Sequence, residues 1–255
     1  MEKTARNTDI AIAYPDAVEL ELRVSMGACR IRISGGAEDG LWASGAYEDP
    51  TGALPPRIEQ DGGVARIRQR HSITSFRGFT GRPQLNLALG GKKPFALRLE
   101  TGACEGVVDL GGLPLTRLVL KQGAGNCAVD FSEANPAEMG VLDVDAGAVN
   151  LVMRHLANAN FHEMALDGGA AAYELDFGGA LQRDASVRIN SGVSSVKLIV
   201  SADTAAKLTP GSVLGSLNVG DGLTKKEGAF WTAAAIAGKT PVLSVVANVA
   251  LGEAR

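Results

Sequence analysis

Positive charge is concentrated in one stretch of this sequence, from residue 57 to residue 98. The stretch holds nine Lys and Arg residues against Glu59 and Asp61, whereas the whole chain carries a net charge of −3. Guanidinium groups interleaved with aromatic rings suit the binding of phosphate-rich polymers, lipid headgroups or an acidic partner. The alternative is that these arginines only solvate an outward strand face or pair with acidic segments. The predicted anion- or partner-binding site consists of Arg66, Arg68, Arg70, Phe76, Arg77, Phe79 and Arg82.

The three cysteines, Cys29, Cys104 and Cys127, each follow a glycine by two residues. We expect Cys104 and Cys127 to be neighbours along one ladder. Zinc needs a fuller set of Cys and His ligands than this spacing supplies, so we predict small buried thiols and no metal site. An odd number of cysteines argues against a disulfide framework and favours a reducing compartment.

Carboxylates and histidines form no catalytic arrangement at a recognised spacing. Asp109, Asp130 and Asp176 recur at one place in successive segments, where stacked carboxylates would perturb each other's pKa or bind a cation. Their alternation with apolar residues predicts instead that they point into solvent. Asn158 and Asn160 are expected to bond backbone groups at a turn. We therefore predict no catalytic residue, no cofactor and no enzyme.

Glycines followed by small residues divide the middle of the chain into similar segments. Gly102, Gly125, Gly147, Gly169 and Gly192 stand 22 or 23 residues apart, each between two short alternating stretches. One such segment cannot bury its own apolar side, but stacked segments pair their backbones about 4.8 Å apart and share a core. The period predicts an all-β solenoid with coils of about 22 residues and glycine at the corners.

Composition agrees with such a fold, since Gly is frequent at 32 residues and aromatics make up only 5%. We expect one elongated domain over residues 1–255. Its parts are an N-terminal coil, irregular insertion and cap (1–93), regular coils (94–220) and a C-terminal cap (221–255) that includes an apolar strand from Pro241 to Leu251. The sequence shows no apolar run of membrane-helix length and no signal peptide. This predicts a cytoplasmic location, or the cytoplasmic face of a membrane.

Several motifs of these segments resemble the toastrack-type domains, which occur in LiaF-like cell-envelope stress proteins and related candidate adhesins. The resemblance covers residues 85–251 well and the first 84 loosely. It implies a single-stranded, right-handed β-helix-like fold, a place beside membrane segments or regulators in bacteria, and no established enzymatic role. The matching motifs are 94–104, 109–118, 123–125 before 129–131, 156–161, and 168–170 before 175–179.

These observations favour a non-enzymatic binding or scaffold module, with envelope-stress sensing or an adhesin-like role as its setting. The expected partner is a protein or an anionic polymer or headgroup; the net negative charge argues against nucleic acid. The solenoid ends offer a route to homo-oligomers. The alternatives are a carbohydrate-active enzyme on a parallel β-helix and a purely structural, self-assembling protein.

Overall fold

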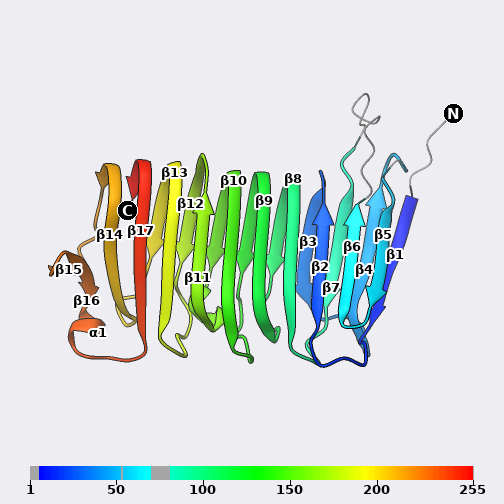
Figure 1. The fold of residues 1–255 in the computed structure, drawn as a ribbon, viewed down its shortest axis with the longest axis horizontal. Coiled ribbons are helices and arrows are strands. Elements are labelled where there is room, and N and C mark those ends of the chain that lie inside the picture. The colour runs from blue at the N-terminus through cyan, green and yellow to red at the C-terminus, as the bar shows by residue number, and fades with distance from the viewer. Residues whose placement is uncertain (1–5, 53, 70–80, 255) are drawn as a thin grey trace.

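The computed structural model describes residues 6–52, 54–69 and 81–254. The described residues form seventeen strands of one continuous sheet, which winds through a stack of parallel coils (Figure 1). Beside the strands stand the short helix α1 (Ala233–Ile236) and the 3-10 turn η1 (Leu156–Ala159). No helix in these ranges is long and apolar enough to cross a membrane. The predicted all-β solenoid is confirmed.

The middle of the chain forms the regular coils. Each coil runs along one side of the stack (side A), bends at a glycine and continues along a second side (side B). Residues in register on successive coils are 21, 24, 22 and 23 positions apart, which confirms the predicted period of about 22. The strands are β8 (Phe95–Asp109), β9 (Leu115–Asp130), β10 (Met139–Arg154), β11 (Phe161–Gly168) with β12 (Ala171–Asp176), and β13 (Ala185–Ile199).

The N-terminal coil lies between two segments that follow it in the sequence. On side A, β2 (Glu21–Met26) pairs in parallel with both β6 (Val64–Gln69) and β8. On side B, β3 (Arg30–Gly35) pairs with both β7 (Gln84–Leu89) and β8. Antiparallel pairings of β1 with β4, β4 with β7 and β5 with β6 complete this end of the stack (Figure 1). The added strands are β1 (Arg6–Ala13), β4 (Leu41–Asp49) and β5 (Pro56–Asp61).

The last strand of the chain lies inside the stack. β17 (Val242–Ala254) pairs in parallel with β13 on one edge and with β14 (Ala205–Leu217) on the other. The chain thus passes from β13 to the outer strand β14, forms the hairpin of β15 (Leu223–Lys226) and β16 (Ala229–Thr232), and returns through α1 (Figure 1). The apolar strand expected near 241–251 exists. It does not belong to the expected cap but lies within the stack, where both of its edges are paired.

Aliphatic side chains of successive coils stack into inward ladders. Leu22, Leu97, Leu118 and Leu142 follow one another in register on side A, and each is at most 2% exposed. A side chain on a parallel strand faces the same side at every second residue, so the alternation seen in the sequence is what builds this core.

The corner glycines are required because the coils approach closely there. A Cβ atom on Gly147 would lie 2.3 Å from the carbonyl oxygen of Gly123, and one on Gly102 would lie 2.4 Å from that of Gly27. The expected corner residue Gly125 is corrected to Gly123, because the register aligns Gly125 with Cys104 instead. The glycine ladder is Gly27, Gly102, Gly123, Gly147, Gly169 and Gly192.

Candidate functional site

Three arginines form a row across side A at the N-terminal end of the stack. Arg66 on β6 stands opposite Arg23 on β2, and Arg23 stands opposite Arg98 on β8. Neighbouring strands are about 4.8 Å apart, so three guanidinium groups leave the sheet within about 10 Å of strand spacing. In the adjacent row Arg57 on β5 stands opposite Arg68. Five arginines therefore gather on four neighbouring strands; this surface is called the arginine face below.

Glutamates compensate part of this charge. Arg23 donates to Glu21 at 2.5 Å, Arg98 to Glu100 at 2.7 Å, and Arg57 pairs with Glu59 at 2.6 Å. The hydrogen bond to Glu21 raises the pKa of Arg23 above its ordinary value, so its charge is secure. The alternative interpretation, pairing with acidic groups, is therefore true of these three arginines.

Positive groups on the arginine face nevertheless exceed the negative ones. Arg66 and Arg68 have no ion-pair partner within the described part of the chain. The Nε atom of Arg23 is buried and makes no hydrogen bond, although most buried polar atoms make one. The accessible guanidinium groups of Arg66 and Arg68 are thus left for an anionic group above this face.

The structure divides the predicted site residues between different places. Arg66 and Arg68 project from side A, whereas Arg82 precedes β7 and pairs with Glu105 of side B at 2.8 Å. The remaining four predicted residues lie outside the described residues: Arg70, Phe76, Arg77 and Phe79.

Sequence reasoning left Arg23 and Arg98 out of the site. Both alternate with leucine and valine, which shows that they point outward. They lie near Arg66 because β2 is inserted between β6 and β8. The local sequence does not predict this insertion.

Farther along the stack, side A becomes acidic. Beyond β8 the row that contains Glu100 continues through Lys121, Asp145 and Asp167. Lys121 forms an ion pair with Asp145, and Asp167 accepts a hydrogen bond from Asn190 at 2.9 Å. Beyond β8 this row therefore carries one positive and two negative groups, in contrast to the row of three arginines at the N-terminal end.

A shallow groove runs along the glycine ladder and includes Glu100, Asp145 and Asp167. All three carboxylates already have partners, and no aromatic residue is among those that line the groove. Glycosidases need one carboxylate free to protonate the leaving group and another free to act as base or nucleophile. The groove does not supply this arrangement.

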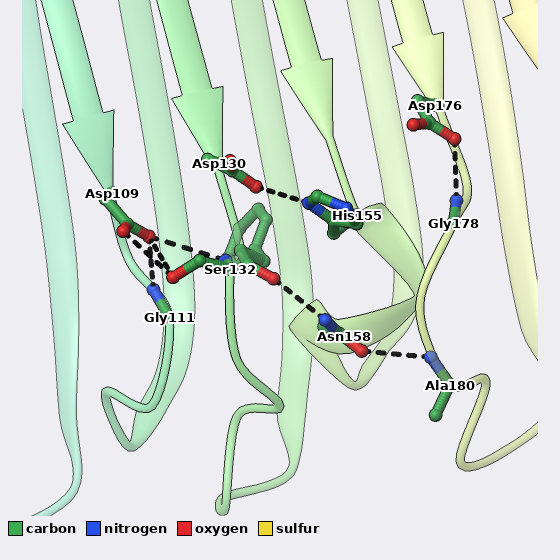
Figure 2. A network of polar contacts seen from close by, with 10 residues as sticks. Asp109, Gly111, Asp130, Ser132, His155, Asn158, Asp176, Gly178 and Ala180 are labelled. Carbon is green, nitrogen blue, oxygen red and sulfur yellow. Dashed lines mark hydrogen bonds and ion pairs between the residues drawn. The ribbon is translucent and has the colours of Figure 1, made fainter.

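The recurring aspartates stabilise the turns that follow side B (Figure 2). Asp109 accepts from the Gly111 backbone N–H at 3.0 Å and from the Ser132 hydroxyl at 2.8 Å. Asp176 accepts from the Gly178 N–H at 2.8 Å. These aspartates are partly buried turn residues, so the expected full hydration of outward carboxylates is corrected in part.

A serine, a histidine and two aspartates lie close together here, but they do not form a catalytic triad. The Ser132 hydroxyl bonds to Asp109, whereas His155 Nδ1 lies 2.7 Å from Asp130 (Figure 2). A nucleophile needs its hydroxyl directed at the base, and here it is directed at a carboxylate of the preceding coil. No group of three or more potential metal ligands occurs among the residues that the structure places.

Buried asparagines connect the turns of neighbouring coils. Asn135, 1% exposed, donates to the carbonyls of Leu115 at 2.8 Å and Ala159 at 3.0 Å. Asn158 donates to the Phe131 carbonyl at 2.9 Å (Figure 2). The predicted role of the asparagines in bonding backbone groups is confirmed, and Asn135 adds a member that the sequence analysis missed.

The cysteines are buried, as predicted, but they pair differently. Cys104 contacts Cys29, with 3.1 Å between the Sγ atoms, while Cys127 stands opposite Gly106. The expected contact of Cys104 with Cys127 is wrong. Cys104 stands opposite Gly125, and Cys127 lies two residues farther along β9. Burial raises the pKa of Cys127 to about 12.

These features define a class: a β-solenoid of stacked parallel coils with polar turn ladders and a charged sheet face. The family model described as the N-terminal domain of toast_rack, DUF2154, matches residues 1–148. The chain belongs to this family. The match includes the first 84 residues, where the sequence motifs resemble the family only loosely.

One of the similar solved structures shares the fold at a TM-score of 0.50. A candidate cell adhesion protein from Clostridium sporogenes is 15% identical, with 98% of each chain covered and a TM-score of 0.50. Candidate adhesins from Bacteroides fragilis and Parabacteroides distasonis are 12% and 11% identical, with TM-scores of 0.42 and 0.41. The alignments cover 99% of this chain and 96% of the first, and 100% of this chain and 98% of the second. No curated protein matches the chain.

Proposed function

We propose that this chain is a non-enzymatic binding module whose arginine face recognises phosphate-bearing polymers or headgroups. The observation that carries the proposal is the row of Arg66, Arg23 and Arg98 on three adjacent strands. A flat row of guanidinium groups matches repeated phosphates better than a single small anion, because each group addresses a different phosphate.

The polar turns support a non-enzymatic role. Their serine, histidine and aspartates are engaged in holding the coils together, and the carboxylates of the glycine groove are paired. Turnover by the purified protein on a panel of polysaccharides would contradict this part of the proposal.

Binding is tested with two phosphate sources. One arm measures cosedimentation with phosphatidylcholine vesicles that contain or lack phosphatidylglycerol, and the other measures binding of soluble polyphosphate. Preference for polyphosphate would favour an adhesin-like role on a cell-surface polymer. Preference for the anionic vesicles would favour sensing at a membrane face. Added salt weakens either interaction, because exposed charges are screened.

The decisive variant is Arg66→Gln with Arg68→Gln. We expect a roughly thirtyfold loss of affinity, at about 1 kcal/mol for each arginine near an anionic surface. Arg154→Gln with Arg188→Gln is the matched control, since both residues are exposed and removal leaves the same net charge. Equal losses of affinity in both double variants would mean that only net charge matters, and would contradict binding at the arginine face.

A second candidate function is self-assembly through the ends of the stack. The outer edge of β14 pairs with β16 only at Lys207 and Leu208, so its later described residues offer unpaired backbone. Such edges add strands from other chains. Analytical ultracentrifugation tests this; a mass independent of concentration and equal to one chain contradicts it.

A further inference from the structure

The C-terminal end of the stack contains an apolar pocket. Figure 1 shows β14 and the β15–β16 hairpin at the opposite end of the stack from β5 and β6, which carry part of the arginine face. Its volume is about 310 Å³, and its walls come from β13, β14 and β17, from the β15–β16 hairpin and from the loops that follow β13 and β14. This volume is at the lower end of the range of about 300–1,000 Å³ found for small-molecule pockets.

The pocket continues the inward ladders of the solenoid. Leu198 stands in register with the buried Leu175 of the preceding coil, while the pairing of β13 with β17 extends only to Val196. Leu198 therefore has a neighbour on one side and borders the pocket on the other. Val245 and Leu208, which pair with each other across β17 and β14, form part of the wall. An aliphatic chain in this space would contact the same kinds of side chain that fill the core elsewhere.

One lysine stands beside the pocket on the hairpin. Lys225 pairs with Phe230, and Leu223 pairs with Thr232, so these four side chains share one face of the hairpin. Leu223, Phe230 and Thr232 line the pocket, and the Nζ atom of Lys225 lies 5.8 Å from the centre of the Phe230 ring. Lys225 has no ion-pair partner within the described ranges.

We propose that this pocket binds a single-chain anionic amphiphile, with its aliphatic chain in the pocket and its carboxylate at Lys225. The combination of apolar walls and one unpaired cation beside them selects this chemistry over a neutral hydrocarbon or a cationic amphiphile. Asp221, in the loop between the lining residues Gly220 and Gly222, opposes the binding of an anion and limits its affinity.

The experiment uses the full chain and the fluorescent fatty acid cis-parinaric acid. We expect saturable binding at one site per chain and displacement by dodecanoic acid more readily than by dodecanol. Lys225→Gln should weaken the binding of dodecanoic acid by a factor of roughly two to five, the effect of one exposed ion pair, and leave that of dodecanol unchanged. Asp221→Asn should strengthen the binding of dodecanoic acid.

Lys226→Gln is the matched control, because Lys226 neighbours Lys225 but points to the other face of the same hairpin. Filling the pocket from the inward Ala247, as Ala247→Phe, should abolish binding of both ligands. If that variant does not fold, Ala202→Trp in the exposed lining loop blocks the same space.

Three binding results would each overturn the proposal. They are the absence of saturable binding by the unmodified chain, equal weakening by Lys225→Gln and Lys226→Gln, and unchanged binding in a folded blocking variant. Association of two chains that excludes the fatty acid would also overturn it, since a second copy would then be the occupant of this end.

Discussion

The sulfur atoms of Cys29 and Cys104 lie 3.1 Å apart, although the two residues are 75 positions apart in the sequence. Both side chains are almost fully buried, between the N-terminal coil and β8. The hydrogen bond between the two thiols and burial raise the pKa of Cys29, while the same hydrogen bond lowers the pKa of Cys104. The two thiols are in contact because the N-terminal coil lies directly beside β8.

Mild oxidation of the folded protein with diamide should join Cys29 to Cys104. Diamide takes up the two protons and two electrons that the thiols release, and the neighbouring Sγ atoms need to move only by about 1 Å to bond. Peptide mass spectrometry under non-reducing conditions identifies the pair. Cys127→Ala should leave the product unchanged, and a cross-link to Cys127 in the folded chain would contradict the observed register.

Gly147→Ala should lower the free energy of unfolding by about 1–3 kcal/mol, the usual cost of local backbone strain. Its new methyl group would meet the Gly123 carbonyl oxygen at 2.3 Å, so the coils would have to separate. Gly140→Ala on the same strand is the control, since its nearest atom would lie at 3.9 Å. Urea unfolding measures both, and equal effects would rule out the close approach as the reason for the glycine ladder.

Asn135→Ala should cost about 3 kcal/mol or more, because each backbone group left buried and unpaired costs about 1–3 kcal/mol. The side chain serves the backbone of three turns, through Leu115, Ala137 and Ala159. Asn126→Ala, an exposed asparagine of side B, should change stability by less than about 0.5 kcal/mol. Chemical denaturation of the two variants compares them; a mild effect at Asn135 would contradict a structural role for the asparagine network.

Stability should fall in acid through Asp49. Although burial alone would raise its pKa, hydrogen bonds from the N–H groups of Leu54 and Thr51 and from the Thr51 hydroxyl outweigh it and lower the pKa. A carboxyl group with a lowered folded-state pKa stabilises the protein above its unfolded pKa of about 3.9, and this stabilisation is lost as pH falls through the folded value.

The corresponding variant is Asp49→Asn, with the exposed Asp39→Asn as control. At pH 7 we expect Asp49→Asn to be the less stable of the two, because an amide accepts fewer of these hydrogen bonds. Its deficit relative to the unmodified protein should shrink below about pH 4. Thermal unfolding at a series of pH values checks this, and a deficit that stays constant down to pH 2 would exclude titration of Asp49 as its source.

Much of the fold could be predicted from residues close together in the sequence. Alternation such as that of residues 97–99 determines which side chains face the core, and recurring glycines mark the corners. These signals are local, because inward direction and the space at a corner depend on a few neighbouring residues. They yielded the solenoid, its period of about 22 residues, the outward direction of Arg66 and Arg68, and the bonding of backbone groups by asparagine.

Only the tertiary structure decided which coils are neighbours. β2 lies between β6 and β8, and β17 lies between β13 and β14. The alternating pattern of each strand would be the same in any other order of the strands. Alternation specifies a face but not a partner, and the partner depends on packing between segments far apart in the chain. That choice placed Arg23 beside Arg66 and Cys29 beside Cys104 and left the pocket beside Leu198. The register between consecutive strands placed Gly123 in the glycine ladder.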